Sequence, residues 1–380
     1  MATIEKRGKT YTARISLKVD GKYKRKSKSG FKTKTAAKSW AIEQENLKNN
    51  GADVLGSQIL FSDYYEQWYT LYKTNITTSS RRWYTYALTL IDRHMAPVTL
   101  EKLSRPIVQA FFNELGENYA YSTSVKMKMY IRGAVKNAMY DGLIQRDPTL
   151  DITLSGKDSK DGSLKHLEEK DLLNLLKHIA DIPLQERNHS DQMILFGANA
   201  GVRYQEAAAL TLQDIIQHTL KEDEYVSSEE ESLLWAANID KAYDQVTKTM
   251  TVTKTDTSER IIDIPEQLAI DLLKWAHELN KRPTDLLFSI DGVKPVSPVA
   301  VNKRLKKILT DIQSSKIITY HGLRHTHATY LISKGLDVQY ISERLGHSSP
   351  LITMKTYAHL FHKKRILETQ KAIKLFDDLL

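Results

Sequence analysis

Residues 321–329 read His321-Gly322-Leu323-Arg324-His325-Thr326-His327-Ala328-Thr329, the densest group of potentially reactive side chains in the chain. If this stretch is a helix, His321 and Arg324 share one face, because residues three apart are neighbours on a helix surface. Leu345-Gly346-His347 and then Tyr357 follow along the sequence. An arginine, imidazoles and a tyrosine in one region favour chemistry on a phosphate group.

Two earlier segments carry the remaining candidates. The first is Ala200-Gly201-Val202-Arg203-Tyr204-Gln205-Glu206, which supplies a second guanidinium group. The second contains Lys254, which lies between two runs where apolar and polar residues alternate as in strands, around 250–252 and 262–264. We therefore expect Lys254 near the bend of a β-hairpin, with Lys248 as the nearest alternative.

This set of side chains suits cleavage of a phosphodiester without a metal ion. Negative charge builds on the non-bridging oxygens in the transition state, and the planar forks of Arg203 and Arg324 match that geometry, for which lysine would not be equivalent. A lysine or histidine can protonate the leaving 5′ oxygen. The hydroxyl of Tyr357, with an ordinary pKa of about 10, needs cationic neighbours or a base to act as a nucleophile.

Several of these candidates also have a structural explanation. Arg203 could form a helix-surface salt bridge with Glu206, three residues further on. His321 and His325 have a spacing found in zinc sites, but the chain has no cysteine, and Arg324 between them would repel a cation. We expect His325 to be a hydrogen-bonded structural residue, and we expect no metal or cofactor.

The first 50 residues carry the positive charge of the chain. The whole chain has a formal net charge of +9, whereas this segment has fourteen Lys and Arg against four Asp and Glu, giving +10 (14 − 4). Alternation from Thr10 to Val19, a turn signal at Asp20-Gly21 and a helix over 35–47, capped by Thr33 or Thr35, predict a small sheet with one basic face, backed by a helix. A solvated lysine-rich tail would not alternate so regularly. This pattern is typical of DNA binding, with candidate contacts at Arg14, Lys18, Lys22, Lys24, Arg25 and Lys26.

The remainder of the chain indicates two further domains. Residues 58–152 have helical spacing throughout, and Lys126 and Arg132 are candidate contacts to DNA phosphates, although such charges usually form only a solvated face. The apolar-free stretch 155–163 marks a boundary. An acidic patch within 221–232 should form a surface insertion that stays away from DNA. The expected fold is mostly α with small β-sheets (α+β), in three domains over residues 1–52, 58–152 and 164–380.

Composition excludes several other classes of protein. Hydrophobic residues make up 41% of the 380 residues, which is enough to form sizeable cores. No run approaches the roughly 20 apolar residues of a membrane span, and the N-terminus lacks the apolar core of a secretory signal. The absence of cysteine excludes disulfides. A cytoplasmic, nucleoid-associated protein is the simplest interpretation.

The motifs in this order resemble those of the tyrosine recombinase family, in particular the integrases of phages and conjugative elements. The pattern is Gly-x-Arg-x-x-Glu, a hairpin lysine, His-x-x-Arg-His, Leu-Gly-His and a tyrosine ten residues later. Gln205 stands where the family often has glycine, which removes no catalytic group. The resemblance implies that Arg203 and Arg324 clamp the scissile phosphate, that His347 hydrogen-bonds it, and that Tyr357 attacks it and holds the 3′ phosphate.

The same resemblance implies the supporting roles. Lys254 would be the general acid for the leaving 5′ hydroxyl, and His321 would assist proton transfer from the nucleophile. Glu206 would support the site without reacting. Residues 1–52 would form a module of three strands and a helix that binds arm sites in double-stranded attachment DNA, residues 58–152 would bind the core sites, and the rest would be a mixed α/β catalytic domain.

The family also implies an assembly. Four copies would act on two duplexes as a homotetramer, with a host DNA-bending protein and an excision factor as further partners. The apolar-rich stretch after Tyr357 includes Ile373, Leu375 and Phe376. We expect part of it to dock on a neighbouring copy, unless it packs on its own domain.

Other functions remain to be weighed. A non-catalytic DNA-binding regulator on the same fold would be expected to lack Tyr357 or one arginine, and neither is missing. A type IB topoisomerase and a chromosome-dimer resolvase share the chemistry, but the basic N-terminal module favours an integrase. A metal-dependent transposase or nuclease would need converging acidic residues.

Overall fold

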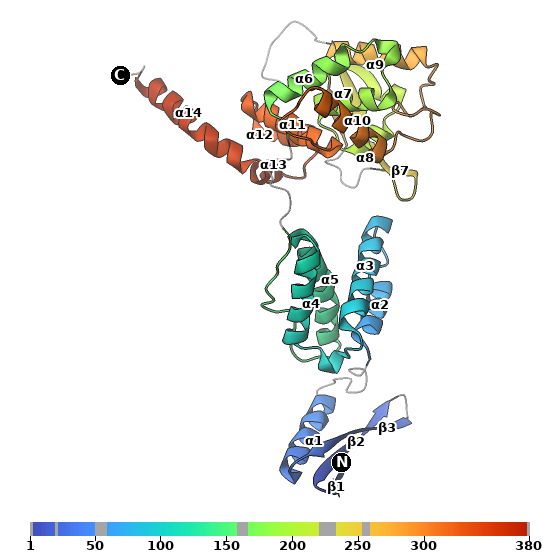
Figure 1. The fold of residues 1–380 in the computed structure, drawn as a ribbon, viewed down its shortest axis with the longest axis vertical. Helices are drawn as coiled ribbons and strands as arrows, with labels where there is room; N and C mark the ends of the chain where they lie inside the picture. The colour runs from blue at the N-terminus through green and yellow to red at the C-terminus, as the bar shows by residue number, and fades with distance from the viewer. Residues whose placement is uncertain are drawn as a thin grey trace. The chain divides into compact units, whose positions relative to one another are not determined.

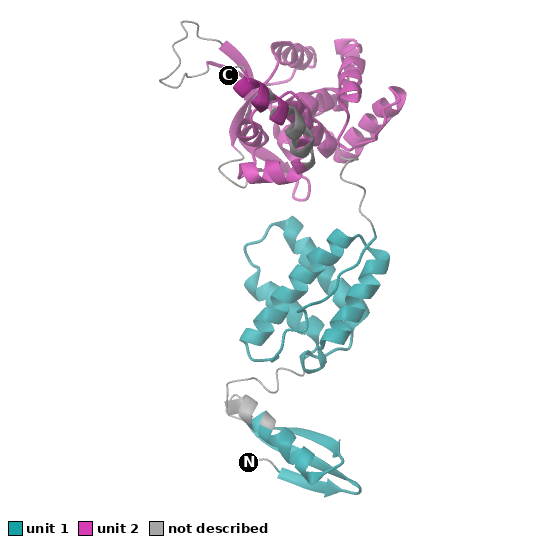
Figure 2. Ribbon diagram, turned by 90° about the vertical axis from the view of Figure 1, so that its left-hand side faces the viewer, with its two compact units in different colours: residues 1–159 teal, residues 160–380 magenta. Residues whose placement is uncertain are grey.

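The computed structural model describes residues 3–19, 22–49, 59–157, 166–219, 233–252 and 259–377. The chain divides into two compact units, residues 1–159 and 160–380 (Figure 2). Both combine helices with small sheets, which confirms the expected fold class (Figure 1). The acidic patch within 221–232 and Lys254 lie outside the described residues. In the part of the chain that is described, no helix is both long and apolar enough to cross a membrane.

A three-stranded antiparallel sheet begins the first unit. It consists, in order, of β1 (Thr3–Arg7), β2 (Thr10–Val19) and β3 (Lys22–Phe31). Helix α1 (Lys34–Asn49) covers one face, where Trp40 packs in a cluster with Ile15. Thr33 caps this helix as predicted, because its Oγ1 accepts a hydrogen bond from the Ala36 N–H at 3.1 Å.

Four helices make up the rest of the first unit. They are α2 (Phe61–Tyr72), α3 (Thr78–Met95), α4 (Arg105–Asn118) and α5 (Tyr121–Tyr140), with a 3₁₀ turn, η2 (Leu100–Lys102), before α4. Their core is rich in aromatic side chains. A Cβ at Gly133 would come within 2.8 Å of the Trp68 indole, so glycine allows α5 to pack closely on α2.

The second unit surrounds a larger hydrophobic core. Its helices are α6 (Glu169–Ala180), α7 (His189–Ala200), α8 (Tyr204–Ala209), α9 (Glu266–Glu278), α10 (Pro298–Asp311), α11 (Tyr320–Ser333), α12 (Val338–Leu345), α13 (Pro350–Thr356) and α14 (Ala358–Asp377), with 3₁₀ turns η4 (Leu184–Glu186) and η5 (Leu212–Asp214). Helix α14 extends away from the body of the unit (Figure 1).

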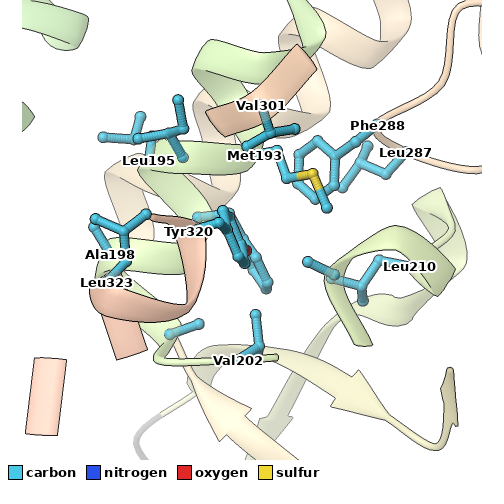
Figure 3. Close-up of a cluster of buried hydrophobic side chains, with 14 of the residues drawn as sticks. Met193, Leu195, Ala198, Val202, Leu210, Leu287, Phe288, Val301, Tyr320 and Leu323 are labelled. Carbon is cyan, nitrogen blue, oxygen red and sulfur yellow. The ribbon is translucent and has the colours of Figure 1, made fainter. Parts of the chain in front are cut away.

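The contact of α7 with α11 sets the position of the site. Figure 3 shows the Tyr320 ring in the core beside Met193, Val202 and Leu210. A Cβ at Gly197 would overlap this phenol ring, so only glycine lets α11 begin so close to α7. Because Tyr320 is the first residue of α11, its burial anchors the turn that carries the histidine and arginine motif.

Two small sheets flank these helices. Strands β4 (Ile215–Thr219), β5 (Leu233–Ile239) and β8 (Arg260–Asp263) form one sheet in the order β4-β5-β8, and β6 (Lys241–Asp244) pairs with β7 (Thr249–Val252) in the other. The predicted hairpin around Lys254 is therefore wrong, because β7 and β8 belong to different sheets. The turn is made earlier: the Asp244 carboxylate accepts a hydrogen bond from the Val246 N–H at 2.7 Å, and Lys248 has a φ of 56°. Lys248, the alternative to Lys254, thus lies in the β6–β7 turn.

Candidate active site

Two arginines from different parts of the second unit meet at the C-terminal end of α12. Arg203, the residue before α8, donates from Nη2 to the Gly346 carbonyl at 3.1 Å. Arg324, on α11, donates from Nη1 to the Gly201 carbonyl at 3.0 Å and from Nη2 to the Leu345 carbonyl at 2.5 Å. Burial and the charge of Arg203 lower the pKa of Arg324 to about 9, so its guanidinium still carries its charge at neutral pH.

The Glu206 carboxylate holds Arg203 in place through both the backbone and the side chain of that arginine. Its Oε1 lies 2.6 Å from Arg203 Nη1, and its Oε2 accepts the Arg203 backbone N–H at 2.8 Å and lies 3.0 Å from Arg260 Nη2. The predicted pair of Arg203 with Glu206 therefore forms. The Glu206 side chain is only 4% exposed, whereas that of Arg203 is 37% exposed, so the carboxylate end of the pair is buried. Burial alone would raise the pKa of Glu206, but the charges of Arg260 and Arg203 hold it below its ordinary value. The network therefore contains two cations for one anion.

His347 is half-buried in the loop between α12 and α13. Its Nδ1 lies 2.8 Å from Oγ1 of Thr353, which is fully buried on α13. Burial and the charges of Arg324, Arg203 and Arg260 lower the pKa of His347 to about 4. The imidazole is therefore neutral at physiological pH, and when Thr353 donates to Nδ1, the proton of the ring stays on Nε2.

Tyr357 lies between α13 and α14 and is only 4% exposed. Its hydroxyl is 2.9 Å from Nδ1 of His325, and the two rings are 5.9 Å apart. The His321 ring lies 4.9 Å from that of His325, at nearly a right angle, and His321 is exposed. Burial raises the pKa of Tyr357 to about 12, although the charge of Arg324 works in the opposite direction.

One open pocket of about 440 Å³ brings these groups together. Its lining includes Arg203, His321, Arg324, His325, Gly346, His347 and Tyr357. All the predicted catalytic residues except Lys254, which lies outside the described residues, therefore face one space. Two guanidinium groups, neutral imidazole and a phenol around a pocket of this kind can bind a phosphodiester and attack it.

The phage integrase family matches residues 165–364, which is more than half of the chain, and an arm DNA-binding domain matches residues 3–46. The chain belongs to the phage integrase family. The resemblance to tyrosine recombinases seen in the sequence is thereby confirmed.

Individual relatives agree with this family. The integrase of Staphylococcus phage L54a is 24% identical over 73% of this chain and 81% of its own length. Among solved structures, the Tn1549 transposon integrase in complex with transposon right end DNA has a TM-score of 0.66 at 15% identity, and covers 82% of this chain and 99% of its own. A lambda integrase tetramer bound to a Holliday junction has a TM-score of 0.56 at 14% identity, with coverage of 93% and 94%.

The N-terminal sheet of this integrase divides its basic residues between two faces. Arg14 and Arg25 lie on the face away from α1, with Arg25 exposed. Lys26 is instead paired with Ile15, whose side chain faces α1, and Lys26 is buried, so the expectation of a single basic face is wrong for this residue. Lys22 and Lys24 pair in register with Val19 and Leu17, and the side chains of Lys18, Lys22 and Lys24 lie outside the described part.

The two candidates on α5 of this integrase are partly engaged with other groups. Lys126 Nζ lies 3.9 Å from the centre of the Trp83 ring, and Arg132 Nε lies 3.7 Å from Asp147 Oδ2. Both side chains are half-buried. Their contact with DNA therefore stays a prediction.

Two residues of the integrase site were missed by sequence reasoning. Arg260 lies at the start of β8 and joins Glu206 to the Arg344 carbonyl, to which its Nε donates at 2.8 Å. A lone arginine beside a strand gives no signal in the sequence. For His325 the sequence predicts a hydrogen-bonded structural residue. The hydrogen bond is present, but its partner is the Tyr357 hydroxyl, in the pocket that His321 also lines. In the part of the chain that is described, no group of three or more His, Cys, Asp or Glu is placed to hold a metal ion.

Proposed function

We propose that this site-specific DNA recombinase integrates and excises a mobile element through a 3′-phosphotyrosyl bond at Tyr357. The observation that carries the proposal is the convergence of Arg203 and Arg324 on one end of α12, in the pocket that Tyr357 also lines. Two buried or half-buried cations beside a tyrosine need an anion that both can reach. A scissile phosphate has the charge and the shape for this position.

In the proposed cleavage step, Oη of Tyr357 attacks the phosphorus, and the bond from phosphorus to the 5′ oxygen breaks. Arg203 and Arg324 stabilise the charge on the non-bridging oxygens, and neutral His347 donates a hydrogen bond from Nε2. Lys254 protonates the leaving oxygen. Rejoining is the same step in reverse, with a 5′ hydroxyl as the nucleophile.

The arm DNA-binding match over residues 3–46 favours an integrase over a chromosome-dimer resolvase. We assign residues 1–52 to arm sites, 58–152 to core sites and 164–380 to catalysis. The presence of Arg203, Arg324, His347 and Tyr357 in one pocket argues against a non-catalytic regulator.

A homotetramer on DNA is part of the proposal. The lambda integrase structure of similar fold is a tetramer on a Holliday junction. In the present chain α14 extends away from its unit, and Ile373, Leu375 and Phe376 near its end are 56%, 68% and 69% exposed. These side chains would be covered if α14 docked on a neighbouring copy. A cytoplasmic, nucleoid-associated location, a host bending protein and an excision factor complete the proposal.

The test is covalent capture of DNA. Wild type and Tyr357→Phe are incubated, in the presence of a chelator, with a library of nicked random-sequence duplexes, and DNA that stays attached to denatured protein is sequenced. Capture of a common sequence by wild type alone supports the proposal and supplies a substrate. Capture by both would move the nucleophile elsewhere, and no capture with tight binding by both would favour a silent DNA-binding protein.

A further inference from the structure

His325 contacts the atom that would react. Its Nδ1 lies 2.9 Å from the Tyr357 hydroxyl, a distance at which one group donates a hydrogen bond to the other. The residue follows Arg324 directly on α11 and lines the same pocket as both arginines. The sequence alone predicts only a structural role for His325. The contact with Tyr357 indicates a role in the reaction.

The surroundings of Tyr357 make a local proton acceptor necessary. The phenol packs with Ala328, Ile332, Ile341 and Leu345 in an apolar cluster, so water reaches little of it. Burial raises its pKa to about 12, and a neutral phenol is a poor nucleophile. Its proton must pass to a group within hydrogen-bond distance as the oxygen attacks.

We propose that His325 is a catalytic residue of this recombinase, which orients the hydroxyl of Tyr357 and accepts its proton through Nδ1 during cleavage. This inference rests on the proposed function, since it assumes that Tyr357 is the nucleophile. It assigns to His325 the contact that the resemblance would give to His321, whose ring lies 4.9 Å from that of His325.

The step balances without a further reactant. The bond from Tyr357 Oη to phosphorus forms as the hydroxyl proton moves to His325 Nδ1, and the bond from phosphorus to the 5′ oxygen breaks as that oxygen takes a proton from its general acid. In rejoining, the 5′ hydroxyl attacks, and the imidazolium of His325 returns its proton to the departing tyrosine.

Charged and titratable groups from several elements surround His325. Arg324 and His321 lie on the same helix. Arg203 lines the pocket from just before α8, His347 from the loop after α12, and Tyr357 from the junction of α13 and α14. Two of these are permanent cations. A neutral imidazole in this position is ready to accept a proton, and its other nitrogen, Nε2, then carries the hydrogen.

A first experiment needs no DNA. In full-length protein with ¹⁵N-labelled histidine, the signals of His325 are assigned by their loss in His325→Asn. We expect Nδ1 to be unprotonated and hydrogen-bonded at neutral pH, and its shift to change in Tyr357→Phe, where the donor is absent. A His325 with its proton on Nδ1, or one whose signals ignore Tyr357→Phe, would overturn the proposal.

A second experiment measures single-turnover cleavage of the captured substrate. His325→Asn keeps an acceptor near the place of Nδ1 but cannot take a proton, whereas His325→Ala removes both functions. We expect both to cleave about a hundredfold or more slowly at neutral pH, and to regain rate as pH rises towards the pKa of Tyr357. Wild type should level off instead. His277→Asn, an exposed histidine on α9, is the control for the substitution itself.

A change of the leaving group distinguishes the role of His325 from that of the general acid. A bridging sulfur in place of the 5′ oxygen leaves without needing a proton, so it should restore cleavage by Lys254→Ala and leave the His325 variants slow. Wild-type rates in His325→Asn, or faster cleavage by His325→Ala, would refute the proposal, the latter by showing that His325 restrains Tyr357.

Thermal melting and DNA binding of each variant report on folding. If wild type itself makes no covalent product, the proposed function is contradicted. The histidine spectra still test the contact between His325 and Tyr357.

Discussion

Arg203 and Arg324 donate hydrogen bonds to consecutive carbonyls, those of Gly346 and Leu345, at 3.1 Å and 2.5 Å. One peptide segment thus holds two like charges at the mouth of the pocket. Their mutual repulsion is part of the reason why the pKa of Arg324 falls to about 9. An anion bound between them would relieve that repulsion, so this pair of guanidinium groups should favour the binding of phosphate.

Inorganic phosphate should therefore stabilise the catalytic unit. We expect the melting temperature of wild type to rise with phosphate concentration, relative to chloride at equal ionic strength, because a ligand that binds only the folded state shifts the unfolding equilibrium. Arg324→Gln removes one of the two cations and should lose most of this shift. An equal shift in the variant would place the anion elsewhere.

Removal of the buried carboxylate should destabilise the same unit. Glu206→Gln leaves the guanidinium groups of Arg203 and Arg260 without a compensating charge, and breaking a buried ion pair in this way costs about 3–5 kcal/mol. Glu169→Gln is the matched control, because its pair with Lys334 is nearly half exposed and screened by solvent, so its loss should change stability little. Urea unfolding followed by tryptophan fluorescence measures both. Similar losses in the two variants would show that the Glu206 network adds nothing to stability.

The hydroxyl of Thr353 should matter for cleavage more than for folding. Thr353→Val keeps the shape of this buried side chain but removes its hydrogen bond with His347 Nδ1, so the proton of the imidazole is no longer fixed on Nε2. We expect cleavage to fall about tenfold, a typical size for the loss of a second-layer hydrogen bond. In Thr310→Val, where the exposed hydroxyl on α10 bonds the Lys306 carbonyl away from the pocket, the rate should stay unchanged. Single-turnover cleavage, with DNA binding measured in parallel, gives the comparison.

Protonation of His327 should contribute to the pH dependence of the free energy of unfolding. Burial and the charge of Arg344 lower its pKa from 6.5 to about 3, while its ring links the Ala198 carbonyl to Arg344 Nε. Between these two values the unfolded chain takes up a proton that the folded chain does not. The free energy of unfolding therefore has its full contribution above pH 6.5 and falls as the pH is lowered, by roughly 2 kcal/mol for this group by about pH 5.

His327→Gln tests that assignment, because an amide does not titrate. We expect the variant to be less stable at neutral pH but to lose less stability than wild type between neutral pH and pH 5. His347, with its pKa lowered to about 4, acts in the same direction in both proteins, so only the difference between the two curves reports on His327. Parallel curves from urea unfolding would exclude the buried histidine as the cause.

The sequence predicts the candidate site residues better than their partners. Arg203, Arg324, His347 and Tyr357 stand in short motifs whose residue types indicate the proposed chemistry, and the structure brings them into one pocket. The partner of a strand depends on turns elsewhere in the chain, so the pairing of β7 with β6 was not visible from alternation alone. For the same reason Arg260, which reaches the site only because β8 lies beside β5, had no signal in the sequence.

For His325, the sequence predicts the helix position but not the side chain's hydrogen-bond partner. Its helix and its side of that helix were predictable from spacing, but the hydroxyl it meets is set by how α13 ends and where Tyr357 is buried. Such a contact depends on tertiary packing of residues far apart in the chain. Lys26 is a different case, because the register is unbroken from the Val19–Lys22 pair to the Ile15–Lys26 pair, and the irregularity between Tyr11 and Ala13 lies beyond it. Its position opposite Ile15 therefore follows from the local hairpin pairing.

The division of the N-terminal sheet into two faces predicts which face binds DNA. Arg14 and Arg25 lie on the open face, whereas α1 covers the other. Binding of a random-sequence duplex depends on salt through the phosphates that the protein neutralises, with a slope of log affinity against log salt of about −0.9 for each. Deleting residues 1–49 should make the slope clearly shallower, because that segment carries the excess positive charge of the chain.

Point variants then measure how much each face of the sheet contributes to DNA binding. Arg14→Gln with Arg25→Gln should reduce the magnitude of the slope by up to about 2, one unit for each lost phosphate contact. Lys28→Gln with Lys38→Gln removes the same charge from exposed positions on the side of α1 and should change the slope less. Fluorescence anisotropy over a range of salt concentrations gives all three slopes. If the second pair has the larger effect, DNA lies against α1, and the open face of the sheet is free for another use.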